Sequence, residues 1–197
     1  MVTFPTLDDK FFGWLVKIDE EAARRVAEQG CRLCGGPLHR GDYPRKPRGG
    51  LMALAGEVFS RRISLCCGTD GCRRRSMPPS VRFLGRRVYL GVAVVLASAL
   101  LCQAAVKEVK RATGVPIRTV RRWGAWWQQE FPQSPLYQEQ RGSFLPPLEV
   151  TQLPASLVER FAAAQRSDPE VLARLLCFLS PLTTGSVQGG ACFLRAE

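Results

Sequence analysis

The sequence predicts a mainly α-helical protein that also contains a small β zinc ribbon. Two groups of cysteines, separated by a stretch rich in glycine, proline and arginine, are typical of a zinc ribbon. A long apolar run follows, and then a basic segment around a Gly-Val-Pro turn that predicts helices on both sides. With 197 residues, 46% of them hydrophobic, the chain can form one compact unit or two small ones that share a core.

The order of these features divides the chain into five segments. Apolar residues at helical spacing run up to Gly30, a residue type that often ends helices, so the chain is expected to begin with a helix. A stretch rich in proline and glutamine predicts a linker. The expected segments are an N-terminal helix (1–30), a zinc ribbon (31–82), a helix-turn-helix (83–131), a linker (132–153) and a C-terminal helical segment (154–197) with a loose end.

The cysteine spacing predicts one zinc ion held by four thiolates. Two residues separate the first pair, and the two glycines that follow allow the tight turn that such a pair needs. The second pair is wider, because four residues separate its members. Four thiolates leave no open coordination position, so the ion is expected to be structural. The expected ligands are Cys31, Cys34, Cys67 and Cys72, with Cys66 as the alternative to Cys67.

The choice between Cys66 and Cys67 depends on the strand that contains them. The run Arg62–Cys66 alternates polar and apolar residues, which predicts a β-strand. Cys67 then shares a face with Ile63 and Leu65, whereas Cys66 lies on the other face. If the apolar face turns toward the ion, Cys67 is the ligand.

The remaining histidine and cysteines are not expected to bind metal. His39 follows the first cysteine pair at the spacing of a retroviral-type knuckle, but the fourth position of that motif is Pro44, which cannot coordinate. His39 is therefore expected to lie at the surface or to form a hydrogen bond with the backbone. Cys102, Cys177 and Cys192 stand alone in apolar contexts, which favours a role as small buried hydrophobic residues.

Positive charge is concentrated in the middle of the chain. The net charge is +11, yet residues 40–122 alone hold 18 lysines and arginines against 4 aspartates and glutamates. A clustered basic surface gains affinity for nucleic acid by releasing the counterions of phosphates. We therefore expect duplex DNA as the partner, and a basic face that only keeps the protein soluble is the alternative.

Residues 106–127 have the layout of a helix-turn-helix. Gly114 stands where the turn needs a left-handed residue, and Pro116 presets the backbone of the second helix. Lys110 occupies a position that is usually small, so its side chain is expected to point outward. The residues expected in the core are Val120, Trp123 and Trp127. The expected DNA contacts are Ile117, Arg118, Arg121 and Arg122 in the major groove, and Arg73, Arg74 and Arg75 on the ribbon.

The apolar run at residues 88–106 has a second interpretation. It carries no charge and is close to the roughly 20 residues that a helix needs to cross a bilayer. However, it is rich in alanine, glycine and serine, contains Gln103, and has basic residues at both ends, so neither side is marked as cytoplasmic. A buried helix that precedes the helix-turn-helix therefore fits better than a membrane anchor.

The C-terminal region predicts two short helices, near 154–166 and 168–180, with Asp168 and Pro169 as the start of the second. An apolar stripe on these helices is expected to pack on the core. The alternative is a surface for dimerisation or for docking a transposase. The stripe comprises Leu172, Leu175, Leu176 and Leu179, preceded by Leu157, Val158 and Phe161.

The order of the motifs resembles a known combination. The Cys-x-x-Cys pair, the run Cys-Arg-Arg-Arg-Ser-Met-Pro-Pro-Ser, an apolar helix, a Thr-Gly-Val-Pro turn and Thr-Val-Arg-Arg-Trp cover residues 31–127. Together they resemble the zinc-ribbon plus helix-turn-helix modules of bacterial insertion-sequence transposases and their small accessory proteins. The resemblance implies recognition of transposon-end or operator DNA. The ribonuclease-H-like catalytic domain of such transposases is not expected in the residues after Phe131.

The sequence offers no catalytic motif. It has one histidine, and it contains no HExxH, Walker loop, GxSxG or GxGxxG pattern. We therefore expect a cytoplasmic, nucleoid-associated DNA-binding protein without enzymatic activity or small-molecule substrate, either a transposon-encoded accessory factor or a regulator. The alternative is a zinc-stabilised adaptor that binds a partner protein through its basic face.

Overall fold

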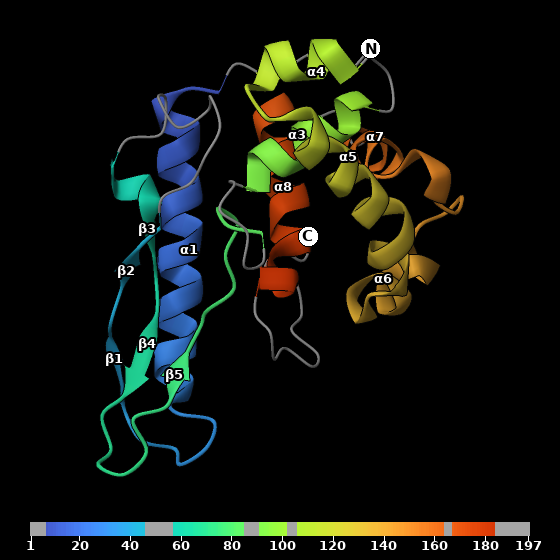
Figure 1. Cartoon of the computed structure of the whole chain (residues 1–197). Helices are drawn as coiled ribbons and strands as arrows, with labels where there is room; N and C mark the ends of the chain where they lie inside the picture. Colours follow the sequence, from blue (N-terminus) through green and yellow to red (C-terminus); the bar gives the residue numbers. More distant parts are fainter. Residues whose placement is uncertain (1–6, 46–56, 85–90, 102–105, 164–166, 184–197) are drawn as a thin grey trace.

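The computed structural model describes residues 7–45, 57–84, 91–101, 106–163 and 167–183. These residues form a mainly helical protein with two small antiparallel sheets, and Figure 1 shows the strands lying beside α1, with the other helices grouped together. The helices are α1 (Asp9–Gln29), α3 (Gly91–Leu101), α4 (Val106–Thr113), α5 (Ile117–Ala125), α6 (Pro135–Gln140), α7 (Ala155–Ala162) and α8 (Asp168–Leu179). The strands are β1 (Leu38–Arg40), β2 (Tyr43–Pro44), β3 (Arg61–Arg62), β4 (Leu65–Cys67) and β5 (Arg75–Ser76).

The N-terminal helix expected from the sequence is present as α1. It begins where the Asp8 carboxylate accepts a hydrogen bond from the Phe11 backbone N–H (2.9 Å). It ends at Gly30, whose φ of +72° is a backbone conformation that residues with a Cβ rarely adopt. One face of α1 is buried and packs on the strands and the core, with Phe12 meeting the Phe59 ring at 5.1 Å between centroids.

The strands form two sheets, which we call the ribbon (residues 31–45 and 57–84). One sheet has the order β1-β4-β5, with Leu38 opposite Cys67, and the other pairs β2 with β3. The single strand predicted at Arg62–Cys66 is therefore wrong in detail, because β3 and β4 are separate. Between them Ser64 bonds to the β1–β2 turn, accepting from the Gly41 N–H (2.8 Å) and donating to Asp42 Oδ1 (3.3 Å), which replaces a strand ladder there.

The apolar run after the ribbon forms the centre of the helical part. The described side chains of α3 from residue 91 to 99 are all buried, which accounts for the absence of charge in the run. Residues 88–90 and 102–105, which belong to the same predicted segment, lie outside the described residues. In the part of the chain that the structure describes, no helix combines the length and the apolar content required for a membrane crossing.

Helices α4 and α5 flank a short turn of three residues. Gly114 in this turn has a φ of +66°, as predicted, and its N–H donates to the Lys110 carbonyl (2.9 Å). The Lys110 side chain is exposed, also as predicted. Val120 and Trp123 on α5 are buried, and α3, α4 and α5 contact one another in pairs. The helix continues as a short π-helical turn (Trp126–Glu130), which contains the buried Trp127.

The segment that composition predicts to be a linker folds into α6 and several short helical turns. Its aromatic residues join the core: the Tyr137 ring lies 5.4 Å from that of Phe131, which lies 4.9 Å from that of Trp127. Phe144 meets Phe178 of α8 at 5.9 Å. These contacts fix the segment to the helical turns that follow α5 and to α8, so the proline-rich composition does not produce an extended connection.

The two C-terminal helices predicted from the sequence correspond to α7 and α8. The cap of α8 is Ser167 and not Asp168, which is the first residue of the helix. The Glu170 carboxylate accepts from the Ser167 N–H (3.2 Å) and hydroxyl (3.0 Å). The α8 leucines of the predicted stripe and Leu157 are buried in the core, whereas Val158 and Phe161 are half-buried against it. Those leucines therefore offer no exposed surface for a partner. The expected loose end at 184–197 lies outside the described residues.

A buried ion pair connects α1 to the end of the ribbon. Asp19 is 1% exposed, and its Oδ2 accepts from the Arg82 Nε (2.7 Å) and the Ser80 hydroxyl (2.6 Å). Its Oδ1 accepts from the Val81 backbone N–H (2.7 Å). Arg82, 2% exposed, also donates to the Phe59 carbonyl (3.3 Å). Each buried charge thus has a partner of opposite sign and further hydrogen bonds.

The same residues reach the helical part of the protein. The Arg82 carbonyl accepts from the N–H of Gly91, the first residue of α3 (2.8 Å). The Ser80 N–H donates to the Thr183 hydroxyl, just after α8 (2.9 Å). Residues 80–82 therefore hold α1, the ribbon, α3 and the end of α8 together.

Replacing Asp19 with asparagine tests this connection. Asp19→Asn keeps the size of the side chain but leaves the Arg82 charge buried without its counter-ion, so we expect the free energy of unfolding to fall by about 3–5 kcal/mol. Urea denaturation measures it. The control is Glu28→Gln, which removes an exposed ion pair with Arg24 on the same helix and is expected to cost at most about 0.5 kcal/mol. Equal stability of the two variants would contradict the role assigned to Asp19.

Candidate metal centre and nucleic-acid interface

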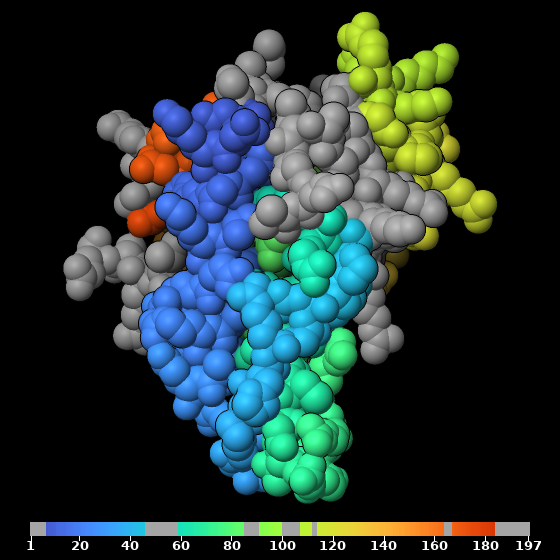
Figure 2. Space-filling view, turned by 90° about the vertical axis from the view of Figure 1, so that its left-hand side faces the viewer, coloured from blue at the N-terminus to red at the C-terminus, as the bar shows by residue number. Residues whose placement is uncertain are grey.

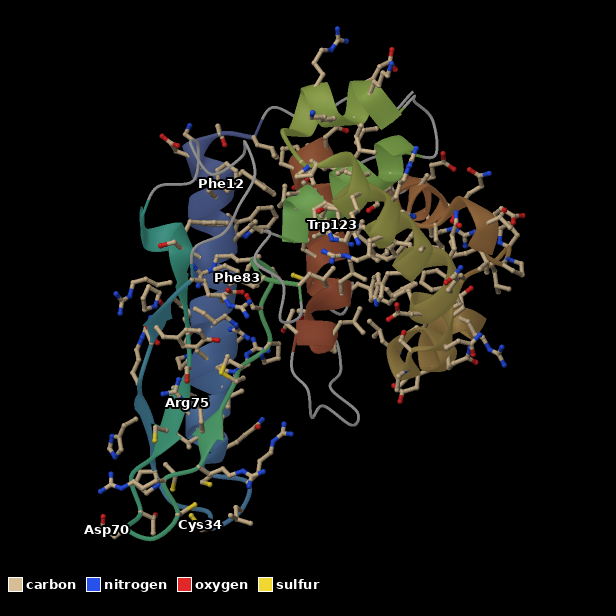
Figure 3. The ribbon with its side chains drawn as sticks, viewed as in Figure 1. Phe12, Cys34, Asp70, Arg75, Phe83 and Trp123 are labelled. Carbon is tan, nitrogen blue, oxygen red and sulfur yellow. The ribbon has the colours of Figure 1, made fainter. Side chains whose placement is uncertain are left out.

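Four cysteine sulfurs meet at the end of the ribbon farthest from the helical part, where Figure 3 labels Cys34 and Asp70. The sulfurs of Cys31, Cys34, Cys67 and Cys72 all lie within 4.8 Å of one another. We call these four residues the cysteine cluster. The Sγ atoms of Cys31 and Cys72 are 3.8 Å apart, and those of Cys34 and Cys67 are 3.5 Å apart. Sulfurs bound to one tetrahedral zinc at about 2.3 Å would lie about 3.8 Å apart, so the spacing fits a metal ion.

The first loop, from Cys31 to Gly36, directs backbone N–H groups at the Cys31 sulfur. The chain turns back after α1, with the Gly35 N–H donating to the Cys31 carbonyl (2.7 Å) and the Cys31 N–H donating to the Gly36 carbonyl (2.9 Å). The N–H groups of Leu33 and Cys34 then point at the Cys31 sulfur and lower the pKa of its thiol. The loop therefore favours the thiolate form, which is the form that binds metal.

The second loop, which connects Cys67 to Cys72, lowers the pKa of the Cys67 thiol in the same way. The hydroxyl and the backbone N–H of Thr69 both donate to the Cys67 sulfur, and they lower the pKa of this thiol to about 6. The loop closes where the Cys72 N–H donates to the Thr69 carbonyl (3.1 Å). Gly71 and Arg73 both have positive φ values, +82° and +44°, so the wider spacing of this pair is accommodated by left-handed backbone.

The two loops are fastened to each other. The Gly68 N–H donates to the Pro37 carbonyl (2.9 Å), which joins the second loop to the first. A Cβ at Gly36 would lie 2.0 Å from the Thr69 hydroxyl oxygen, so only glycine leaves room for the hydroxyl that bonds the Cys67 sulfur. The positions of the four sulfurs are therefore set by the backbone.

Cys72 shows what a bound cation would change in the cluster. The Arg74 N–H lowers the pKa of the Cys72 thiol. The neighbouring Cys34 sulfur and burial act in the opposite direction and outweigh this effect, so the pKa is raised to about 12. Negative charge on the other sulfurs makes this thiol the hardest to ionise. A metal ion removes that repulsion and deprotonates a coordinating thiol outright. Four thiolates would leave no position for a substrate, so such an ion would be structural.

The structure places Cys67, and not Cys66, in the cluster. Cys66 points to the opposite face of β4, where its Sγ lies 3.5 Å from the Arg73 carbonyl oxygen. His39 is exposed on β1, opposite Cys66 in the sheet register, and does not belong to the cluster. Cys177 is buried, as predicted, whereas Cys102 and Cys192 lie outside the described residues.

The three ribbon arginines predicted to contact DNA are all exposed on or next to β5. Arg73 forms an ion pair with Asp70 (2.7 Å), in which both side chains are largely exposed. Arg75 lies over the Tyr43 ring, with 5.8 Å between the guanidinium carbon and the ring centroid. Arg74 and Arg75 are therefore the freer cations of the three.

The arginines predicted on the second helix of the pair are also exposed. Arg118, Arg121 and Arg122 lie on the face of α5 opposite to Val120 and Trp123, and Ile117 is half-buried. The structure adds three exposed cations on α4 that were not among the predicted DNA contacts, although Lys110 was expected to point outward. We call the six cations the α4–α5 basic surface: Lys107, Lys110, Arg111, Arg118, Arg121 and Arg122. Among the described residues, none of the six forms an ion pair.

Not all the basic residues of the middle segment are available to a partner. Arg62 and Arg82 are each 2% exposed. Arg62 donates to the carbonyls of Ile63 and Pro78, and burial lowers the pKa of its guanidinium. The charge count of the sequence therefore overstates the charge of the surface.

A pocket of about 310 Å³ lies between α1, residues 79–81 and the end of α8. Its walls are mainly apolar and include Trp14, Ile18 and Val81. It contains the Cys177 thiol but not the histidine that a cysteine nucleophile would need, because His39 lies on the ribbon. Of the two acidic residues in its lining, Asp19 is bound to Arg82, and Glu21 forms ion pairs with Arg24 and Arg25.

Comparison with protein-family models, with curated proteins and with solved structures gives no match to this chain.

The cysteine cluster predicts about one bound metal ion per chain, measured by elemental analysis of protein purified without added metal. Cys67→Ser is expected to lose the ion, because the residue supplies one of the four sulfurs. Cys66→Ser is the matched control, since it removes the adjacent thiol and should leave the metal content unchanged. Equal loss in both variants would contradict the assignment of Cys67.

The Thr69 hydroxyl gives a second test of the site. Thr69→Val removes the donor to the Cys67 sulfur while keeping the shape of the side chain, so we expect metal affinity to fall by about 10- to 100-fold. Thr69→Ser retains a hydroxyl and should bind nearly as tightly as the unchanged protein. Competition with a chromogenic chelator measures both. If valine and serine variants bound alike, the hydroxyl would have no part in holding the thiolate.

Proposed function

We propose that the protein is a sequence-specific duplex-DNA-binding protein in which α4 and α5 act as a helix-turn-helix and a zinc ion holds the ribbon. The observation that carries this proposal is the α4–α5 basic surface. Its six cations are exposed and unpaired among the described residues, on two helices whose opposite faces are buried. A solvated face without a polyanion partner would be expected to carry both signs of charge, whereas the one acid on α4 and α5 is Glu108.

The geometry of the helix pair supports DNA recognition through α5. In a helix-turn-helix the N-terminal residues of the second helix contact base edges in the major groove. Ile117 and Arg118 occupy that end of α5, with Arg121 and Arg122 one turn later. Arginine forks suit both guanine edges and phosphates, and an apolar residue such as Ile117 suits the thymine methyl group. Trp123 and Trp127 are buried in the core, so their rings are not available to stack on bases.

The donor set supports zinc as the ion of the cysteine cluster. Four thiolates in tetrahedral spacing are typical of structural zinc sites, and soft sulfur ligands disfavour magnesium and calcium. Few apolar residues of the ribbon lie near its tip, where Leu33 is 70% exposed, so the ion would replace a hydrophobic core there.

The resemblance to insertion-sequence modules supports a role as a transposon-encoded accessory factor or a regulator that acts by occupying DNA in the nucleoid. The pocket beside Asp19 adds no arrangement of groups for catalysis. The alternative, an adaptor that binds a partner protein through the same basic face, predicts no preference among duplexes.

Binding to duplexes selected from a random pool tests the proposal. If about six phosphates are neutralised, the log–log dependence of affinity on salt should have a slope near −5. Arg118→Ala should weaken binding by about 1–3 kcal/mol and relax the sequence preference, because it removes a base contact. Arg141→Ala, an exposed arginine outside α4 and α5, is the control and should change neither property. Failure to bind any duplex, or binding without sequence preference, would favour the adaptor.

A further inference from the structure

We propose that residues 191–194 of the chain itself, which we call the apolar segment, bind in the pocket between α1 and the end of α8. This inference does not depend on DNA binding. It follows from the walls and the volume of the pocket, from the place where the chain leaves α8, and from the sequence that comes next.

The pocket lies beside an apolar stripe of α1 that is in contact with solvent. Trp14, Ile18 and Ala22 follow one another at intervals of four residues, so they share a face of the helix, and all three line the pocket. Trp14 is 37% exposed, and covering such a large apolar side chain is favourable. Figure 2 shows atoms of α8 on one side of α1 and the strands of the ribbon on the other. The pocket lies on the α8 side, where Cys177 and Ser180 line it.

The volume of the pocket suits two or three side chains of an extended segment. It measures about 310 Å³, whereas a cavity of about 150 Å³ holds one benzene ring. A phenyl ring and an aliphatic side chain would therefore fit together. A helix of a partner protein, about 10 Å wide with its side chains, would not.

The chain leaves α8 at the edge of this pocket. Ser180, which caps the end of α8, lines the pocket, and the Thr183 hydroxyl accepts from the N–H of Ser80, another lining residue (2.9 Å). The seven residues 184–190 can span at most about 25 Å, and three of them are glycines, which allow the chain to reverse its direction. Residues that follow such a short connection have a millimolar effective concentration at the pocket.

The residues that follow this connection have the chemistry that the pocket would bind. Residues 184–190 are mostly small or polar, whereas the apolar segment has the sequence Ala-Cys-Phe-Leu. Phe193 and Leu194 are residue types that gain much from burial. A glycine-rich composition alone predicts a loose end, but the tether and the pocket together favour docking of Phe193 against the α1 stripe.

Disulfide formation between Cys177 and Cys192 tests the inference. Cys177 lines the pocket, and docking of Phe193 would bring the adjacent Cys192 to the same place. Diamide takes one hydrogen from each of two neighbouring thiols and is reduced to its hydrazine. Mass spectrometry of the treated protein is expected to show a Cys177–Cys192 disulfide within one chain.

The matched control moves the second thiol along the chain. In the double variant Cys192→Ser, Gln188→Cys, the new position is nearer to Cys177 in sequence. A loose end would form this disulfide at least as readily as the original one, because the loop to be closed is shorter. With the apolar segment docked, the disulfide from position 188 should not form.

Alkylation of the Cys177 thiol by iodoacetamide gives a second measurement. Phe193→Ser is expected to speed this reaction by about tenfold or more, because burial of a phenyl ring favours the docked state by about that factor. Val187→Ser, which changes an apolar residue before the apolar segment, should leave the rate unchanged.

Three results would each overturn the inference: an unchanged alkylation rate in Phe193→Ser, a disulfide that forms from position 188 as readily as from position 192, or a disulfide that joins two chains. The last of these would show that the apolar segment binds a second copy of the protein instead. None of them bears on the proposed function.

Discussion

The buried pair of Asp19 and Arg82 is the constraint on which the arrangement of the whole protein depends. Two charges removed from water are costly unless each is fully satisfied, and here the carboxylate accepts from a guanidinium, a hydroxyl and a backbone N–H. These bonds require residues 80–82 to lie against the middle of α1. Because Gly91 and Thr183 bond to the same short segment, the positions of α3 and of the end of α8 follow from it.

The two ends of the molecule are stabilised by different means. The helical part has a continuous apolar core, in which Trp123, Trp127 and Phe131 are each at most 1% exposed. The ribbon narrows to strands of two or three residues with few apolar side chains at the tip, and four sulfurs gather where a core would otherwise be. An ion bound by these sulfurs, as proposed, would stabilise the tip, whereas the helical part depends on packing. Helix α1 belongs to both, because its buried face contacts the core and its end leads into the cluster.

Local patterns were sufficient to predict much of the fold and of the candidate site. The cysteine spacing indicated the cluster, and the glycine at the α4–α5 turn and the apolar stripe of α5 indicated a buried helix pair with a basic outer face. The burial of Arg82 could not be predicted, because its partner lies 63 positions earlier in the chain. The folding of residues 132–153 into helices depends on ring contacts of Tyr137 with Phe131 and of Phe144 with α8, and composition alone suggested a linker. The division between β3 and β4 likewise depends on Asp42, a residue of another turn.

The position of Asp19 within α1 has a consequence for how such a protein can evolve. The ribbon cannot be exchanged by recombination at its first cysteine, because the helix before it supplies the counter-ion of Arg82 and the carboxylate of Glu20 that holds Arg40. The segment from α1 to Arg82 is therefore expected to be inherited as one block, even though the cysteine cluster itself spans only residues 31–72. The exposed positions of α5 carry no such coupling to the rest of the chain, so they can diverge one at a time. Under the proposed function, changes of DNA preference are therefore expected to accumulate in α5 while the block that carries the cysteines is conserved.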